Sequence, residues 1–142
     1  MPTRRASATW EGGLKDGRGS FNGESGTIGG SYTAGSRFAD SEQGTNPEEL
    51  LAAAEASCFS MALAAGLEKN GTPPTRVSTD AACTVDRVED GFKITTMRLT
   101  TRAQVPGIDA EAFARIAEGT RQGCPVSKAL AGVDIQLDAQ LE

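Results

Sequence analysis

The chain has 142 residues, a net charge of −5 and no histidine, and it is long enough for one domain with a hydrophobic core. We therefore expect a single domain over residues 1–142. The negative charge gives no support for binding to nucleic acid or to an anionic membrane. No uninterrupted run of about 18 apolar residues is present, and the N-terminus has no signal-peptide pattern, so we expect a soluble cytoplasmic protein.

Three cysteines are an odd number, and no C-x-x-C motif occurs, which argues against a secreted disulfide scaffold. The absence of histidine makes a zinc site very improbable, and we expect neither a metal nor a cofactor.

The N-terminal third is rich in Gly, Ser and Thr and is predicted to form a meander of short strands over residues 7–38. A loop over residues 39–46 leads into a helix. Asn46 is its predicted N-cap, because Pro47 fits the first helical position and Glu49 has the capping-box spacing. The helix is expected to run to about residue 69 and to end at Asn70-Gly71.

The remainder of the chain alternates strand and helix patterns. Residues 77–88 and 92–105 are predicted to form a hairpin, because β-branched residues alternate on both sides of a turn. Asp109 is the expected N-cap of an amphipathic helix that Gly123 stops, and residues 133–141 alternate as a last strand. This order of elements predicts an α+β fold with antiparallel sheets.

The long helix contains "LLAAAEASCFSMALAAGL", residues 50–67, which places apolar or small side chains on nearly every side. Such a helix is buried all round. One small sheet covers only one side of it, so the rest needs either the C-terminal sheet or a second subunit. The many alanines allow a close approach, and we expect an intimate homodimer.

Cys58 lies about eleven residues into this helix, roughly 16 Å from its start. The helix dipole acts mainly within the first turn, and burial by itself raises the pKa of a thiol and makes it inert. Cys58 is therefore either a packing residue or a thiolate stabilised by Arg or Lys. Without histidine, Cys-His hydrolases are excluded, and thiol redox chemistry remains.

The other two cysteines differ in their surroundings. Cys124 precedes Pro125 at a predicted short helix, whose first amides would favour a thiolate there; alternatively, it is a small residue in a tight turn. Cys83 is in phase with Val77, Ala81 and Val85 on the apolar face of a strand, so we expect it in the core.

Three segments, "GTNPEELLAAAEASCFSMAL", "VPGIDAEAF" and "GCPVSKAL", together resemble the OsmC/Ohr family of osmotically inducible and organic-hydroperoxide-resistance proteins, and the OsmC branch most closely. The resemblance extends from "ATWEG" to the last strand. It implies an intertwined α+β homodimer that acts as a thiol-dependent peroxidase in oxidative and osmotic stress. Its implied partners are an organic hydroperoxide as substrate and a dithiol of the dihydrolipoyl type as reductant.

By motif position, the resemblance implies that Cys58 is the peroxidatic cysteine and Cys124 the resolving one, joined in a disulfide after oxidation. Glu48 matches the catalytic glutamate of the family. The family also uses an arginine to hold the thiolate. "GSRFAD" matches the OsmC-branch position and indicates Arg37, whereas Arg18 in "KDGRGS" is the alternative from the Ohr branch. Without the resemblance, the simpler interpretation is that Glu48 is an ordinary carboxylate at a helix N-terminus, where the dipole favours it, and that Arg37 and Arg18 are solvated surface charges.

Two further expectations follow. Phe59, Met61 and Leu63 surround Cys58 in sequence, and together with Phe38 they are predicted to form an apolar substrate pocket. The alternative function is a non-enzymatic, stress-induced dimer that binds apolar ligands between its helices. A protein disulfide exchanger is disfavoured by the missing C-x-x-C.

Overall fold

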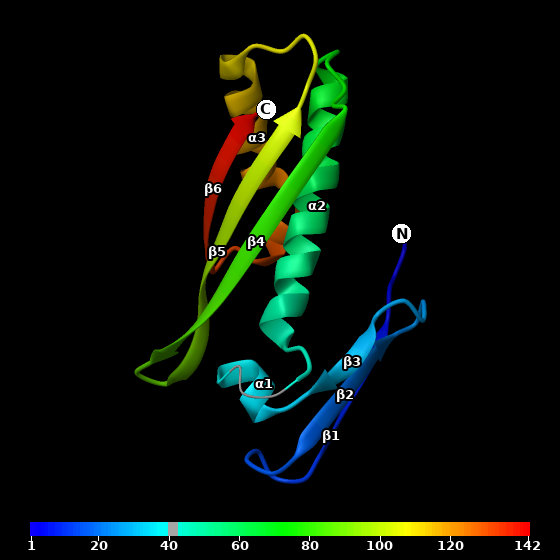
Figure 1. Ribbon diagram of the computed structural model, residues 1–142, viewed down its shortest axis with the longest axis vertical. Helices are drawn as coiled ribbons and strands as arrows, with labels where there is room; N and C mark the ends of the chain where they lie inside the picture. The colour runs from blue at the N-terminus through cyan, green and yellow to red at the C-terminus, as the bar shows by residue number, and fades with distance from the viewer. Residues whose placement is uncertain (40–42) are drawn as a thin grey trace. The chain divides into compact units, whose positions relative to one another are not determined.

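The computed structural model describes residues 1–39 and 43–142, which form two compact units, Met1–Leu50 and Leu51–Glu142. Figure 1 shows the elements in chain order, from blue at the N-terminus to red at the C-terminus. Both units contain a three-stranded sheet, and helices accompany them, which confirms the predicted α+β class. The predicted loop before the long helix includes residues 40–42, which lie outside the described residues.

The first unit contains the predicted meander. Strands β1 (Ala6–Glu11), β2 (Arg18–Gly23) and β3 (Gly29–Tyr32) pair antiparallel in the order β1-β2-β3. The ring of Tyr32 lies 5.5 Å from that of Trp10 between centroids. This small sheet therefore gathers aromatic side chains across its strands.

A short helix that the sequence analysis did not predict follows this sheet. Helix α1 (Ala34–Phe38) begins at Thr33, whose side chain accepts a hydrogen bond from the backbone amide of Ser36, 3.0 Å away. The hydroxyl of Ser36 in turn accepts from the amide of Thr33 at 2.9 Å. This reciprocal cap uses Ser where the usual motif has Glu or Gln, which explains why the pattern predicts a strand or loop instead.

Helix α2 (Pro47–Lys69) agrees with its prediction at both ends. The side chain of Asn46 accepts a hydrogen bond from the amide of Glu49 at 2.8 Å, as expected of an N-cap. Gly71 follows with φ +83°, a left-handed conformation that favours glycine and ends the helix.

The second sheet begins with the predicted hairpin. Strands β4 (Arg76–Val88) and β5 (Gly91–Gln104) pair antiparallel, with a register shift between Thr84 and Val85. Strand β6 (Asp134–Leu141) pairs with β5 in parallel.

This parallel pair differs from the expected antiparallel arrangement, which holds for the other strand pairs. Parallel neighbours need a long crossover between them. Helices α3 (Ala110–Gly123) and α4 (Pro125–Ala129) supply it. Helix α3 begins as predicted, because the Asp109 carboxylate accepts from the amide of Ala112 at 2.7 Å.

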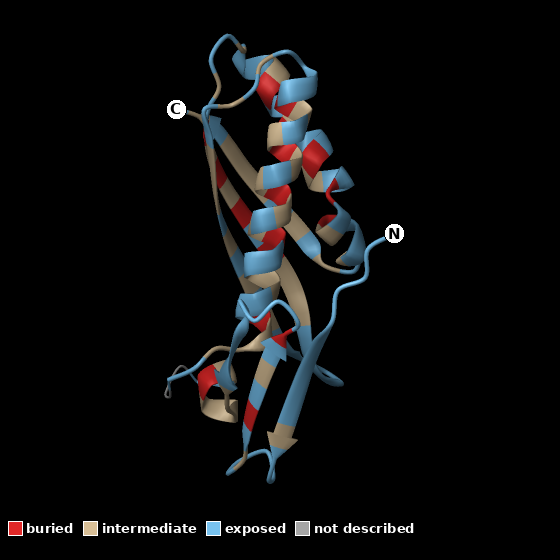
Figure 2. Cartoon of the chain, turned by 90° about the vertical axis from the view of Figure 1, so that its right-hand side faces the viewer, coloured by how far each residue is buried: buried red, intermediate tan, exposed pale blue. Residues whose placement is uncertain are grey.

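The core of the second unit lies between its sheet, α2 and α3. Figure 2 shows buried segments in red on all three. The buried core side chains recur at every fourth residue of the helices and at every second or fourth residue of β5, as expected for one face of each element. They are Phe59, Leu63, Leu67, Met97, Leu99, Ala103, Phe113 and Ala117. Gly66 lets α3 approach closely, since a Cβ there would lie 3.0 Å from Ile116.

Helix α2 is long and apolar enough to cross a membrane by length and composition. Three of its large apolar side chains, Phe59, Leu63 and Leu67, are fully buried in the core of the second unit. On another face of α2, Met61 is 74% exposed.

Candidate active site

Two of the three thiols meet in the second unit. Cys58 lies on α2 beside the core residue Phe59, and Cys124 lies at the junction of α3 and α4. The Cys124 thiol donates to the Cys58 sulfur, and the two sulfur atoms are 2.7 Å apart. Cys124 is almost fully buried, whereas Cys58 is partly accessible. The packing of α4 against α2 therefore brings together two thiols that are 66 residues apart in sequence.

The surroundings of Cys58 disfavour its thiolate. Burial raises the pKa of the Cys58 thiol most, and the hydrogen bond from Cys124 raises it further. The backbone amide of Val126 donates to Cys58 and lowers this pKa, while the negative charge of Glu55 raises it. None of the described groups that set this pKa is a cation. The second unit thus assembles the thiols without the charge that would activate them.

The expectation that helix amides favour a thiolate at Cys124 differs from what the structure shows, because the Val126 amide contacts Cys58. The sequence analysis expected the first amides of the short helix to favour a thiolate at Cys124. In the structure, Cys124 is the residue that precedes the helix, and its side chain makes no capping hydrogen bond. The amide of Val126 points to Cys58 instead.

A second contact joins α2 to α4 beside the thiols, and the sequence analysis missed it. The hydroxyl of Ser127 donates to Glu55 Oε1 at 2.6 Å. Glu55 is fully buried, and its Oε2 has no hydrogen-bond partner among the described residues. The available signal was a single Glu among alanines, one turn before Cys58, in a stretch of residues 50–67 that is otherwise uncharged.

The predicted charged residues meet in the first unit. The Arg37 guanidinium lies against the Glu48 carboxylate, with Nη2 2.7 Å from Oε1 and Nε 3.1 and 3.2 Å from the two oxygens. The Glu48 side chain is 7% exposed and that of Arg37 is 35% exposed. Arg18, the alternative, is exposed on β2. The structure therefore pairs Glu48 with Arg37.

This pair is held by the segments on either side of it. Ser36, next to Arg37, donates from its hydroxyl to the Thr45 carbonyl at 2.9 Å. The Asn46 amide nitrogen donates to the Ser36 carbonyl at 3.1 Å. These bonds tie α1 to the start of α2, so the arginine and the glutamate are positioned by backbone contacts and not by their charges alone.

The predicted apolar pocket is wrong for two of its four residues. Phe59 and Leu63 are fully buried in the core of the second unit, because they share the helix face that packs on the sheet. Met61 lies on another face and is exposed. Phe38 lies in the first unit, 41% exposed, where the Arg37 guanidinium is 4.9 Å from its ring centroid.

The cysteine expected in the core behaves as predicted. Cys83 lies on β4, partly buried against the core together with Val77 and Ala81. Among the described residues, no group of three or more His, Cys, Asp or Glu side chains is arranged to hold a metal ion.

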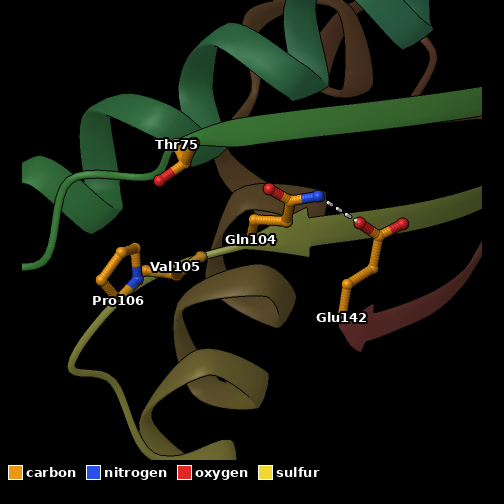
Figure 3. Close-up of a pocket in the computed structure, with 5 residues that line it drawn as sticks. All are labelled: Thr75, Gln104, Val105, Pro106 and Glu142. Carbon is orange, nitrogen blue, oxygen red and sulfur yellow. Dashed lines mark hydrogen bonds between the residues drawn. The ribbon is translucent and has the colours of Figure 1, made fainter.

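Hollows lie on the described surface of both units. In the first unit, an apolar hollow of about 130 Å³ adjoins the start of α2. In the second, a hollow of about 420 Å³ is bordered by Ser127, Arg121 and Lys128. Another of about 400 Å³ lies where β4 begins and β5 and β6 end, and Gln104 donates there to Glu142 at 2.9 Å (Figure 3). The lining of this last hollow contains none of the predicted site residues.

The OsmC family model, described as "OsmC-like protein", matches residues 39–138. The chain belongs to the OsmC family. It is 44% identical to Peroxiredoxin OsmC of Escherichia coli over 140 residues, which is 98% of this chain and 96% of that protein. An Organic hydroperoxide resistance protein of Xanthomonas axonopodis pv. citri is 34% identical over 66% of each chain.

Solved structures agree with this assignment. The organic hydroperoxide resistance protein OhrB of Bacillus subtilis superposes with a TM-score of 0.76 at 27% identity, over 96% of this chain and 98% of that one. The predicted OsmC/Ohr family and fold are thus confirmed. Membership of this family makes the chain a peroxidase, as the sequence resemblance predicts.

Proposed function

We propose that this OsmC-family protein reduces organic hydroperoxides to alcohols through the thiolate of Cys58, with Cys124 as the resolving thiol. The observation that carries the proposal is the 2.7 Å separation of the two sulfurs in one unit. A thiol this close reacts with a sulfenic acid on Cys58 without any large movement of the chain. The names of the relatives, a peroxiredoxin and organic hydroperoxide resistance proteins, support this substrate class.

The reaction has two oxidative steps. The Cys58 thiolate attacks the peroxide, which breaks its O–O bond, leaves a sulfenic acid on Cys58 and releases an alkoxide that takes a proton to become the alcohol. The Cys124 sulfur then displaces the hydroxyl oxygen of the sulfenic acid, which forms the disulfide and releases water. An external dithiol of the dihydrolipoyl type reduces the disulfide by thiol exchange and is itself oxidised.

The first step needs a cation near Cys58, and we assign this role to Arg37. A permanent guanidinium charge within about 4–6 Å of a thiol favours its thiolate. Glu48 orients the guanidinium through its bidentate contact. If Arg37 contacted only the Glu48 carboxylate, its charge would be neutralised there. In this proposal the guanidinium therefore contacts both the Glu48 carboxylate and the Cys58 sulfur.

The cation comes from a second copy of the chain in this proposal. Glu48 and Cys58 are ten residues apart on the continuous helix α2, or about 15 Å along its axis. A side chain cannot bridge that distance. We therefore propose a homodimer in which the Arg37–Glu48 pair of each protomer serves the Cys58 of the other.

The uncovered face of α2 supports this dimer. It carries small and apolar side chains at helical spacing, namely Ala53, Ala54, Ser57, Met61 and Ala65, which are all exposed within the chain. Small side chains permit the close approach of a second helix. In this arrangement the two compact units act together as a single domain over residues 1–142, in the cytoplasm and in response to oxidative or osmotic stress.

The preferred substrate carries an apolar tail. The hollow at the start of α2 is lined by Ala8, Phe21, Tyr32, Asn46, Pro47 and Leu50, and nearly all of its lining is apolar. It adjoins Glu48 in sequence. Each buried methylene is worth about 0.8 kcal/mol, so a few buried carbons give an organic hydroperoxide about a hundredfold advantage over hydrogen peroxide.

The test is peroxide consumption by the purified protein with dihydrolipoamide as reductant. Cumene hydroperoxide should be consumed with a kcat/KM about a hundredfold higher than that for hydrogen peroxide. A Cys58→Ser variant is the control. Consumption no faster than in this variant would reject the peroxidase mechanism and would favour the alternative, a non-enzymatic dimer that binds apolar ligands. Equal rates for both peroxides would reject only the apolar preference.

A further inference from the structure

Two contacts between α2 and α4 lie side by side in the second unit. The first joins the sulfurs of Cys58 and Cys124, and the second joins the carboxyl of Glu55 to the hydroxyl of Ser127 at 2.6 Å. Glu55 precedes Cys58 by three residues, and Ser127 follows Cys124 by three. Residues three apart are neighbours on one helix face, so the carboxyl is held next to the pair of thiols.

The environment of Glu55 is unusual for a carboxyl group. It is fully buried, and only one of its oxygens has a hydrogen-bond partner among the described residues. The ion pairs printed for the described residues join other side chains, and the charge of Glu55 acts on the thiol of Cys58. Lys128, the nearest cation in sequence to Ser127, is exposed. A buried carboxyl without a cation costs stability, and such groups are common at functional sites.

The disulfide-forming step requires such a group. The Cys124 thiol must lose its proton as its sulfur attacks, and the oxygen that leaves Cys58 must gain one to depart as water. Cys124 is almost fully buried, so solvent has little access to its proton. A carboxyl that lies one turn before Cys58 and is bonded to Ser127, three residues after Cys124, can accept the first proton and return it to the leaving oxygen.

We propose that Glu55 carries the proton in the disulfide-forming step, with Ser127 holding its carboxyl in place through Oε1 and leaving Oε2 to take the proton. The Cys124 S–H bond breaks and its proton passes to Oε2. The sulfur's electron pair forms the S–S bond, the S–O bond of the sulfenic acid breaks, and the departing oxygen takes the proton back to leave as water. The sulfenic sulfur is reduced and the Cys124 sulfur is oxidised, so no further reactant is needed. This role rests on the proposed peroxidase mechanism.

A purely structural role for Glu55 makes different predictions. If the Glu55–Ser127 bond only fastened α4 to α2, an acceptor of the same shape would replace the carboxyl. Glu55→Gln keeps an oxygen for the Ser127 hydroxyl but cannot carry a proton between the sulfurs. This substitution therefore separates positioning from proton transfer.

The experiment follows one turnover of the reduced, full-length protein. The protein is mixed with one equivalent of cumene hydroperoxide, quenched with dimedone at successive times, and analysed by mass spectrometry for sulfenic acid and disulfide. In Glu55→Gln, sulfenic acid at Cys58 should form as in the unmodified protein, while the disulfide forms at least about tenfold more slowly at pH 6 to 7. At alkaline pH the difference should shrink, because hydroxide can remove the proton instead.

Glu68→Gln is the matched control, since Glu68 is an exposed carboxylate on the same helix, and it should have no effect. Ser127→Ala keeps the carboxyl but loses its hydrogen bond, and it should slow the disulfide step less than Glu55→Gln. A wild-type rate in Glu55→Gln, or a defect equal at every pH, would overturn the proposal. If Glu55→Gln fails to fold, the pH dependence of disulfide formation in the unmodified protein tests the proposal instead. A rate of disulfide formation that rises about tenfold per pH unit between pH 6 and 8 would mean that hydroxide takes the proton, and it would overturn the role of Glu55.

These outcomes are distinct from a failure of the peroxidase mechanism. If the unmodified protein forms no sulfenic acid at Cys58, both proposals fail. If the sulfenic acid and the Cys58–Cys124 disulfide form but Glu55→Gln leaves their rates unchanged, only the role of Glu55 fails.

Discussion

The two units of the chain carry complementary parts of the proposed reaction. The second unit holds the thiols, where burial raises the pKa of Cys58 and no described cation opposes it. The first unit holds a cation, Arg37, whose charge is met by Glu48. Each part by itself is chemically incomplete, since one is a thiol without an activator and the other an activator without a thiol. The proposed mechanism therefore requires both parts, and the following experiments test that requirement.

The largest expected effect concerns the thiols themselves. Mild oxidation with one equivalent of cumene hydroperoxide should produce a Cys58–Cys124 crosslink in peptide maps, because these sulfurs are already adjacent. Cys124→Ser should abolish the crosslink completely, and Cys83→Ser should leave it unchanged. A dominant crosslink that involves Cys83 would contradict the assignment of the thiols to this pair.

Removal of the cation tests the link between the two units. Arg37→Ala should lower kcat/KM for cumene hydroperoxide about a hundredfold, or about 2.7 kcal/mol in transition-state stabilisation. Burial raises the pKa of the Cys58 thiol, and loss of the cation leaves that rise uncompensated. Less thiolate is then present at neutral pH, so the pH midpoint for alkylation of Cys58 by iodoacetamide should move upward.

Arg18→Ala is the matched control for this prediction, because Arg18 is an exposed arginine of the same unit. It should leave both kcat/KM and the alkylation midpoint unchanged. The opposite result, with Arg18→Ala inactive and Arg37→Ala active, would transfer the activating role to the alternative arginine.

Mixed dimers test whether the parts come from different protomers. Glu48→Ala and Cys58→Ser proteins should each be inactive or nearly so. Random exchange gives half heterodimers, and each of these has one intact site of two, so activity should recover to about a quarter of wild type. Sedimentation should show the dimer. Mixing that restores no activity would place Glu48 and Cys58 of one site in the same protomer, whereas a fully active Glu48→Ala protein would remove the role of Glu48.

The smallest expected effect concerns the support of Cys124. The Asp109 carboxylate caps α3, the helix that ends at the thiol, and Asp109→Ala should lower the free energy of unfolding by about 1 kcal/mol. Urea denaturation measures this change. Glu111→Ala, in the exposed first turn of the same helix, should change stability by less than half as much. Peroxidase activity should persist in both, because neither side chain is near the thiols in sequence.

The sequence by itself determined the local elements and the family. The caps at Asn46 and Asp109, the stop at Gly71 and the hairpin all depend on neighbouring residues, so their patterns predict them correctly. The motifs around Cys58 and Cys124 are equally local, and they identified the OsmC family before any geometry was known. Helix α1 was missed because its cap uses an uncommon residue at the third position.

The tertiary structure decided which side chains meet. That β6 pairs in parallel with β5 depends on how α3 and α4 cross the sheet, and no pattern within the strand encodes it. That Phe59 and Leu63 face the core and not a pocket depends on which side of an evenly apolar helix the sheet covers. Glu55 gained significance only when folding buried it against Ser127, since contacts over 72 residues arise from packing and not from neighbouring sequence.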